Sequence, residues 1–280
     1  MNVKPFIDGL EQTAKSSIRA EQGDYIGEDG LLVCGKCHTP KQGRYQMPWG
    51  EITPPILCKC EQEKRDREEA ERKEAKLRER IARNRREAFP EADMSRWTFS
   101  NDDMSNEKVS TVARNYADNF KLMLEKHKGL LFFGPVGTGK TFYAACIANV
   151  LLDKGYPVLM LDFDRIRNTL QSSFDGRQEY LDSFHRCPLL ILDDLGMESK
   201  SEYMQEIVFS VVDARYKAGL PLIVTTNLTS EQLKNPKDIT QQRIYSRILE
   251  MCLPIKVEGN DKRRDKLKDS FAELSDILGV

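Results

Sequence analysis

Residues 134–141 read Gly134-Pro-Val-Gly-Thr-Gly-Lys-Thr141, and this octapeptide decides the fold. It matches the phosphate-binding pattern GxxxxGK[ST] in full, between an apolar run, Leu130–Phe133, and a helix-like stretch that begins at Phe142. Glycines let the backbone N–H groups of such a loop converge on phosphate oxygens, and the following helix adds its positive N-terminal end. We therefore expect the loop to bind the phosphates of a nucleotide through Gly134, Pro135, Val136, Gly137, Thr138, Gly139, Lys140 and Thr141. Lys140 would reach the β- and γ-phosphates and assist catalysis, and the Thr141 hydroxyl would ligate Mg²⁺.

A pair of carboxylates follows a second apolar run, Leu189-Leu-Ile-Leu-Asp193-Asp194. Asp193 suits the Mg²⁺-binding position of a Walker B strand, alongside Thr141. Asp194 is placed to orient or deprotonate an attacking water. The alternative for either residue is an ordinary solvated acid at a strand end.

Asn227 follows a third apolar run, Leu222–Thr225. An amide at the tip of a strand next to Walker B can sense the γ-phosphate or hold the water, which would make Asn227 a catalytic residue. The alternative is an asparagine that caps a helix beginning near Ser230.

The second half of the chain alternates short apolar runs with helical stretches. The runs are Leu130–Phe133, Val158–Leu161, Leu189–Leu192 and Leu222–Thr225, and helices are expected over Phe142–Leu152, Tyr203–Lys217 and Thr240–Cys252. In this last helix Ile244, Ile248 and Met251/Cys252 would form its apolar stripe. Strands alternating with helices predict an α/β fold with a mostly parallel sheet covered on both faces.

A run of charge precedes this half. Between Glu61 and Ala88, 20 of 28 residues are charged, 11 of them basic and 9 acidic, with no glycine or proline. Six acidic residues stand four positions before a basic one, as in Glu69–Lys73, and such pairs stabilise a helix. The apolar positions are too sparse for a coiled coil. We interpret the run as a solvated helical spacer, with a helix that docks on a partner or on nucleic acid as the alternative.

Four of the seven cysteines lie in a short segment before this run, as Cys34-Gly-Lys-Cys37 and Cys58-Lys-Cys60. Two close pairs at this separation predict a tetrahedral zinc site with four thiolate ligands, Cys34, Cys37, Cys58 and Cys60. The second pair is CxC instead of CxxC, His38 could compete as a ligand, and free thiols remain the alternative. Cys146, Cys187 and Cys252 lie in apolar stretches and are expected in the core.

The charge and the apolar runs of the sequence exclude some classes of function. Lys and Arg total 43 and Asp and Glu 44, so the formal net charge of −1 argues against a uniformly basic nucleic-acid coat but allows a local patch. No stretch approaches 18 consecutive apolar residues, and the first residues lack the apolar run of a secretory signal. We expect a cytoplasmic protein that does not associate with membranes and carries no disulfide framework.

The order of these motifs resembles one family. The phosphate loop, Leu189-Leu-Ile-Leu-Asp-Asp-Leu-Gly196, Val224-Thr-Thr-Asn-Leu228 and Arg243-Ile-Tyr-Ser-Arg247-Ile-Leu-Glu-Met251 together are similar to the DnaC/DnaI-type AAA+ ATPases. These are bacterial and phage replicative helicase loaders, with the IstB transposition ATPases as close cousins. The resemblance covers roughly residues 95–265. The cysteine-rich front end followed by a charged helix also resembles loaders of the phage and Gram-positive type, in which it grips the helicase.

The resemblance implies roles for particular residues. Asn227 would be the sensor 1 residue, and Arg247 the arginine finger that acts on the ATP of a neighbouring subunit. Arg263, in the segment 259–263, would be the sensor 2 arginine, although Lys262 replaces an aromatic that is usual there and Arg264 follows directly. Arg243 and Arg247 share a helix face, so either is a candidate finger. The alternative for each is a surface arginine paired with Glu250 or another acid.

By the same resemblance, the segment Phe163–His185 would correspond to a helical insertion that faces single-stranded DNA in the loader and initiator branch. Candidate DNA contacts here are Arg165, Arg167, Asn168, Gln171, Arg177 and Gln178, with Phe174 and Tyr180 for base stacking. The alternative is an ordinary amphipathic helix pair packed on the sheet.

We therefore predict three parts: a zinc-binding, helicase-docking module over residues 1–60, a charged helical linker over 61–90 and an AAA+ P-loop ATPase domain over 91–280. The expected function is to load a hexameric replicative helicase onto single-stranded DNA, as a homo-oligomer, with ATP, Mg²⁺ and Zn²⁺ as cofactors and hydrolysis driving release. The alternatives are an IstB-like transposition helper and a nucleotide-switched adaptor with negligible turnover.

Overall fold

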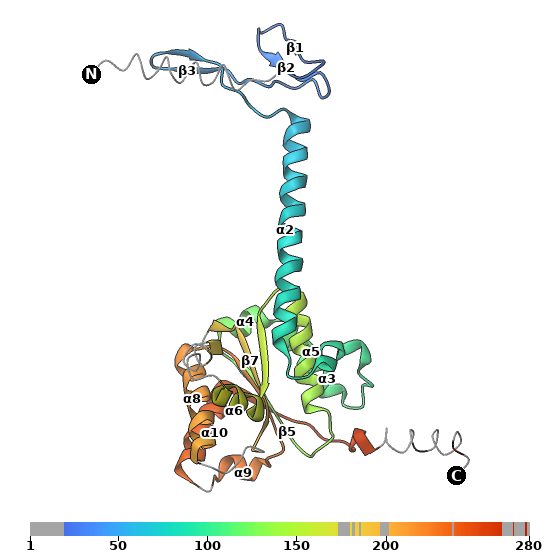
Figure 1. Ribbon diagram of the computed structural model, residues 1–280, viewed down its shortest axis with the longest axis vertical. Helices are drawn as coiled ribbons and strands as arrows, with labels where there is room; N and C mark the ends of the chain where they lie inside the picture. The colour runs from blue at the N-terminus through green and yellow to red at the C-terminus, as the bar shows by residue number, and fades with distance from the viewer. Residues whose placement is uncertain are drawn as a thin grey trace. The chain divides into compact units, whose positions relative to one another are not determined.

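The computed structural model describes residues 20–172, 180, 183, 184, 186–196, 202–236, 238–264, 271 and 278. The chain divides into two compact units, Met1–Leu77 and Arg78–Val280. Figure 1 labels the elements, and each unit is described by itself.

The first unit contains two small antiparallel hairpins. Strand β1 (Tyr25–Ile26) pairs with β2 (Leu32–Val33), and β3 (Tyr45–Met47) pairs with β4 (Gly50–Ile52). Among the described residues of this unit the buried apolar side chains are few, namely Leu31, Leu32, Val33, Cys34 and Cys58. A core of this size needs a cross-link to be stable.

The charged run forms one continuous helix, α2 (Lys59–Ala88), which confirms the predicted helix. Residues 61–80 are exposed, and ion pairs such as Lys73 to Glu69 (2.6 Å) and Lys64 to Glu68 (3.8 Å) line its surface. The end of α2 belongs to the second unit, where Ala88 and the next residue, Phe89, enter the core. Among the described residues no helix is both long and apolar enough to span a bilayer.

A five-stranded parallel sheet forms the centre of the second unit. Its strand order is β6 (Val158–Asp162), β7 (Leu189–Leu195), β8 (Leu222–Thr226), β5 (Gly129–Phe133) and β9 (Cys252–Lys256). Every pair of neighbours is parallel. This sheet, with helices on both faces, confirms the predicted fold class.

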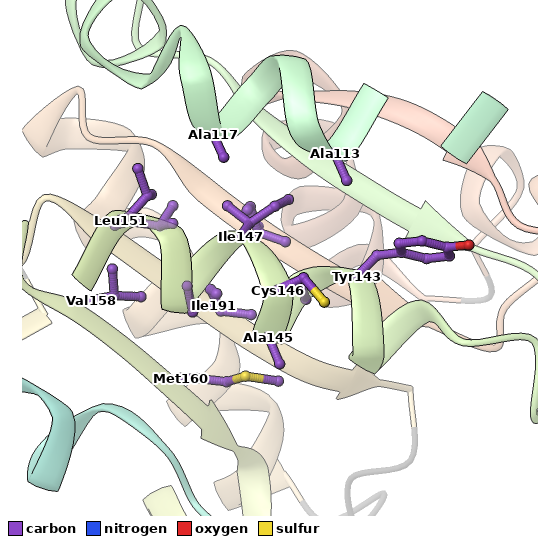
Figure 2. Close-up of a cluster of buried hydrophobic side chains, with 14 of the residues drawn as sticks. Ala113, Ala117, Tyr143, Ala145, Cys146, Ile147, Leu151, Val158, Met160 and Ile191 are labelled. Atoms are coloured by element: carbon purple, nitrogen blue, oxygen red, sulfur yellow. The ribbon is translucent and has the colours of Figure 1, made fainter. Parts of the chain in front are cut away.

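Side chains alternate between two cores, one on each face of the sheet. Leu130 and Phe132 of β5 pack towards α3 (Glu107–Asp118), α4 (Phe120–Glu125) and α5 (Lys140–Asp153). Leu131 points to the other face, which is covered by α6 (Phe163–Ser172), α8 (Glu202–Ala218) and α10 (Ile239–Met251). Figure 2 shows the first core, where the small residues Ala113 and Ala117 of α3 allow a close approach to α5.

The remaining short elements connect these layers. Two 3₁₀ turns, η1 (Ala92–Arg96) and η2 (Phe99–Asn101), lead from α2 to α3, and α9 (Ser230–Lys234) follows β8. The helix expected over Thr240–Cys252 ends at Met251, because Cys252 opens strand β9. This edge strand escaped prediction because Pro254 and Lys256 interrupt its apolar pattern, and an edge strand tolerates both.

Candidate nucleotide-binding site

The phosphate loop connects β5 to α5 and is shaped by three glycines with positive φ. Gly134, Gly137 and Gly139 have φ of 149°, 79° and 95°. Gly139 is the N-cap of α5 and offers no side chain to the first turn, so that turn's N–H groups remain available to an anion. The helix therefore begins at Lys140 with its positive end towards the loop.

Close packing also requires glycine in this loop. A Cβ at Gly134 would lie 2.1 Å from the carbonyl oxygen of Val257, and one at Gly137 would lie 1.9 Å from Oδ1 of Asp261. Both neighbours belong to the segment after β9. The phosphate loop is thus packed between strand β5, which it follows, and the segment after β9.

Lys140 is 5% exposed and folds back over the loop. Its Nζ donates to the carbonyl oxygens of Gly134 (3.0 Å) and Pro135 (2.6 Å). Burial lowers the pKa of Lys140, while Asp194 and Asp193 oppose this shift. A phosphate oxygen would be a stronger acceptor for this ammonium than a neutral carbonyl. The Thr138 hydroxyl donates to Pro135 O (2.9 Å), so its side chain stabilises the loop.

Asp193 and Asp194 occupy a bulge in the sheet. Leu192 pairs with Val224 and Leu195 with Thr226, so two carboxylate residues stand opposite the single Thr225. Asp194 takes the left-handed conformation, with φ of 56°. The two carboxylates of the bulge therefore differ in solvent exposure: Asp193 is 7% exposed and Asp194 is half-buried.

Thr225 joins the two halves of this bulge, a role that no sequence motif indicates. Its hydroxyl donates to Asp193 Oδ1 (2.6 Å) and accepts from the backbone N–H of Asp194 (2.9 Å). Burial raises the pKa of Asp193 to about 6, with a smaller contribution from Asp194, and hydrogen bonds with Thr225 and Thr141 oppose it. Thr225 is fully buried, and a buried hydroxyl at a strand end requires a hydrogen-bond partner.

Asn227 lies one residue beyond β8, next to the end of the strand that carries the two carboxylates. It is half-buried, and it does not cap the next helix. Thr229 is the N-cap of α9, and its side chain accepts from the N–H of Gln232 (3.2 Å). The capping alternative for Asn227 is therefore wrong.

The segment after β9 lies against the phosphate loop. Val257 N–H donates to Phe133 O (2.8 Å), and Lys262 N–H donates to Gly137 O (3.0 Å). Lys262 Nζ pairs with Asp103 at 2.8 Å, which also ties in the turn before α3. Arg263 is exposed and contributes to the lowered pKa of Lys140, so its charge acts on the loop.

The two candidate finger arginines lie on α10, against α8. Arg247 Nη2 is 2.8 Å from Asp213 Oδ1, and its guanidinium stacks over Phe209 at 4.7 Å. Arg243 is exposed and lies over the same ring at 5.2 Å. Arg247 is thus paired with an acid, but the acid is Asp213, and Glu250 instead accepts from the Tyr216 hydroxyl (3.0 Å).

The four cysteines of the first unit come together. The sulfurs of Cys34, Cys37, Cys58 and Cys60 all lie within 4.8 Å of one another, with Cys34–Cys60 at 3.6 Å and Cys58–Cys60 at 3.4 Å. Tetrahedral zinc with Zn–S bonds of about 2.3 Å places its sulfurs about 3.8 Å apart, so the donor set fits zinc. His38 is outside this group, and its Nδ1 lies 3.2 Å from the Tyr25 hydroxyl.

Comparison with known proteins identifies the family. The model of the IstB-like ATP binding protein family matches residues 61–270, which is 210 of the 280 residues. The chain belongs to the IstB-like ATP binding protein family.

Helicase loaders are among its similar proteins. The replicative helicase loader DnaI of Bacillus subtilis (strain 168) is 28% identical over 189 residues, covering 62% of this chain and 61% of DnaI. The replicative helicase loader DnaC of Escherichia coli (strain K12) is 29% identical over 125 residues, covering 43% of this chain and 50% of DnaC. The chain thus spans about half to three fifths of these relatives' length.

A solved structure supports the fold. The crystal structure of DnaI has a TM-score of 0.53 at 26% identity and covers 64% of this chain and 99% of that chain. With the strand order above, it confirms that this IstB-like chain has an AAA+ domain, as predicted.

The segment expected to meet DNA is only partly described. Arg165 Nη1 donates to Phe89 O (2.6 Å), and Arg167 pairs with Asp164 at 2.8 Å, so both arginines have partners within this IstB-like domain. Tyr180 packs edge-to-face on Phe184, with ring centroids 4.9 Å apart, and Asn168 is exposed. The predicted contacts Phe174, Arg177 and Gln178, and the side chain of Gln171, lie outside the described residues.

Proposed function

We propose that this chain is an ATP-dependent loader that binds a hexameric replicative helicase and deposits it on single-stranded DNA, with hydrolysis driving release. The observation that carries the proposal is the site at the strand ends, where the phosphate loop faces a bulge with two differently buried carboxylates. The names of its relatives DnaI and DnaC support the loader assignment.

In this proposal the phosphate loop binds the phosphates of ATP, and Lys140 exchanges its two carbonyl partners for phosphate oxygens. The Asp193 carboxylate and the Thr141 hydroxyl, which opposes the rise in the pKa of Asp193, are hard oxygen donors suited to Mg²⁺. Bound magnesium would neutralise charge on the β- and γ-phosphates. Arg263 adds a positive charge beside the loop.

Hydrolysis requires a group that orients water. Asp194 is less buried than Asp193, and its backbone is fixed by Thr225, so it is free to accept a hydrogen bond from water. Asn227 at the neighbouring strand end would hold the same water or the γ-phosphate. Arg247 would act on the ATP of an adjacent subunit, which makes the active species a homo-oligomer.

The first unit would dock the helicase. Its four clustered thiols fit zinc, which would supply the cross-link that its few buried apolar residues cannot replace. The exposed aromatic residues Tyr25, Tyr45 and Trp49 on the same unit offer contact surface to a protein partner.

Steady-state ATPase assays with and without single-stranded DNA test the enzymatic part. We expect turnover by the full chain with Mg²⁺ and a loss of about 100-fold or more for Asp194→Asn, by removal of a general base. Arg247→Ala should retain ATP binding and lose hydrolysis. ATP binding without turnover in every condition would instead identify a nucleotide-switched adaptor.

Co-purification tests the partner. The full chain should retain a hexameric replicative helicase, and Cys34→Ser should lose it while ATP binding persists. Capture of a transposase in place of the helicase would support the transposition helper.

A further inference from the structure

Asp213 on α8 binds two cations, one on each carboxylate oxygen. Lys217 Nζ is 2.8 Å from Oδ2, one helical turn along α8. Arg247 Nη2, from α10, is 2.8 Å from Oδ1. The Asp213 side chain is 15% exposed and that of Arg247 24%, so the pair is largely shielded from water.

The guanidinium of Arg247 is packed into its own chain. Phe209 lies under it at 4.7 Å and the Tyr216 ring lies at 5.6 Å, both from α8. Its Nη1 is buried without a hydrogen-bond partner among the described residues, and Asp213 Oδ1 likewise lacks an aligned donor there despite its short distance to Nη2. The contact is therefore an ion pair of poor hydrogen-bonding geometry.

We infer that Asp213 is a restraining residue that holds Arg247 against α8 and keeps it from the phosphates of a neighbouring subunit until the oligomer forms. The inference rests on the proposed role of Arg247 as a finger in trans. It adds that, in the isolated chain, the contact between Asp213 and Arg247 keeps the rate of ATP hydrolysis low.

Physical chemistry makes this contact exchangeable. Arg247 leaves one buried N–H group without a hydrogen bond among the described residues, and its carboxylate partner also binds a lysine. Its interactions in this position are therefore weaker than those of a fully hydrogen-bonded arginine. A triphosphate offers a planar guanidinium two parallel acceptors and more charge. Lys217 would remain on Asp213 after Arg247 leaves, so the buried carboxylate would not be left unpaired.

The test is the dependence of ATP hydrolysis on protein concentration for the full chain. Asp213→Asn removes the charge at nearly constant volume. We expect it to raise the rate at low protein concentration about fivefold, the ratio expected from loss of one partly exposed ion pair. The concentration for half-maximal activity should fall by a similar ratio, and Asp213→Glu, which keeps the charge, should stay within about twofold of wild type.

Two further variants separate restraint from other effects. Lys217→Ala leaves the Arg247 pair in place and should not raise the rate. Arg247→Ala combined with Asp213→Asn should be as slow as Arg247→Ala alone. If Asp213→Asn fails to fold, as judged by its thermal unfolding midpoint, Phe209→Leu removes the stacking surface and should give the same rise.

Unchanged or lower hydrolysis by a folded Asp213→Asn protein would overturn the inference, as would a rise that persists in the Arg247→Ala background. Another result would contradict the proposed role of Arg247 itself, and the inference with it. Wild-type hydrolysis by Arg247→Ala would show that this arginine is not the finger.

Discussion

Thr225 and Asp193 are joined by a 2.6 Å hydrogen bond from hydroxyl to carboxylate, at the point where two neighbouring strands reach the phosphate loop. Because the same hydroxyl accepts from the Asp194 N–H, one side chain fixes both acids of the bulge. Thr225 thus positions the two carboxylates that the proposed chemistry uses.

Thr225→Val keeps the shape of the side chain and removes the hydroxyl. We expect the Mg²⁺ concentration for half-maximal hydrolysis to rise by about tenfold or more, the usual effect of losing a hydrogen bond to a metal-binding carboxylate. Magnesium titration of the ATPase rate measures it. Thr225→Ser, which keeps the hydroxyl, should behave nearly as wild type, and equal magnesium requirements for Val and Ser would refute the positioning role.

Asp193 should make the metal-free protein less stable at neutral pH. Its pKa is about 6 in the folded state against an ordinary 3.8, so the native state binds the proton more tightly. Stability from this group is therefore present below about pH 4 and is lost as pH rises to about 6. In magnesium- and nucleotide-free buffer, Asp193→Asn should be more stable than wild type above pH 6, by up to about 3 kcal/mol.

Chemical denaturation at pH 4 and pH 7 measures this difference. The two proteins should converge at pH 4. A variant less stable than wild type at pH 7 would show that the Asp193 hydrogen bonds outweigh the cost of its buried charge.

Gly137→Ala should weaken nucleotide binding, because the added Cβ would lie 1.9 Å from Asp261 Oδ1 and the φ of 79° at this position disfavours a side chain. Gly259→Ala is the matched control, since its φ is also positive (134°) but nothing lies within 4 Å of the added Cβ. Binding of a fluorescent ATP analogue should weaken by about tenfold or more for Gly137→Ala, reflecting a steric and conformational cost of more than about 1.4 kcal/mol. Equal loss in both variants would mean that backbone strain alone, and not the contact with Asp261, sets the requirement.

The parts of the fold that the sequence predicted are those with local signals. The phosphate loop follows from its glycine spacing, α2 from its charge pairs, and four of the strands from uninterrupted apolar runs. Strand β9 was missed because an edge strand need not be continuously apolar. Its position beside β5 depends on pairing between residues more than 100 positions apart, which no local pattern reports.

Side chains that act through tertiary contacts were also beyond prediction. Arg215 lies in the predicted helix over Tyr203–Lys217, but no local pattern indicates that its side chain is fully buried. It donates to the backbone carbonyls of Phe184, Cys187, Pro188 and Pro221. Asp213 and Thr225 likewise gain their roles only from a neighbouring element. The expected burial holds for Cys146 and Cys252, whereas Cys187 is half-buried.

Thr39 should set how firmly the first unit holds zinc. Its Oγ1 is 3.1 Å from Cys37 Sγ and accepts from the N–H of Lys59 (2.9 Å), so it links the two cysteine pairs. Thr39→Val should release zinc to a chelator about tenfold faster than wild type, as expected for a lost second hydrogen-bonding layer. A colorimetric chelator assay measures the rate. Thr39→Ser is the control. Identical rates of zinc release by the Val and Ser variants would show that the Thr39 hydroxyl does not affect zinc retention.

The most direct test of the loader assignment is transfer of a hexameric replicative helicase to circular single-stranded DNA. The helicase, the circle and this chain are mixed with ATP, and helicase that stays on the circle after gel filtration is measured. We predict that wild type loads the helicase and leaves the complex, while Asp194→Asn loads it and remains bound. Helicase on the circle in equal amount with and without this chain would contradict the account.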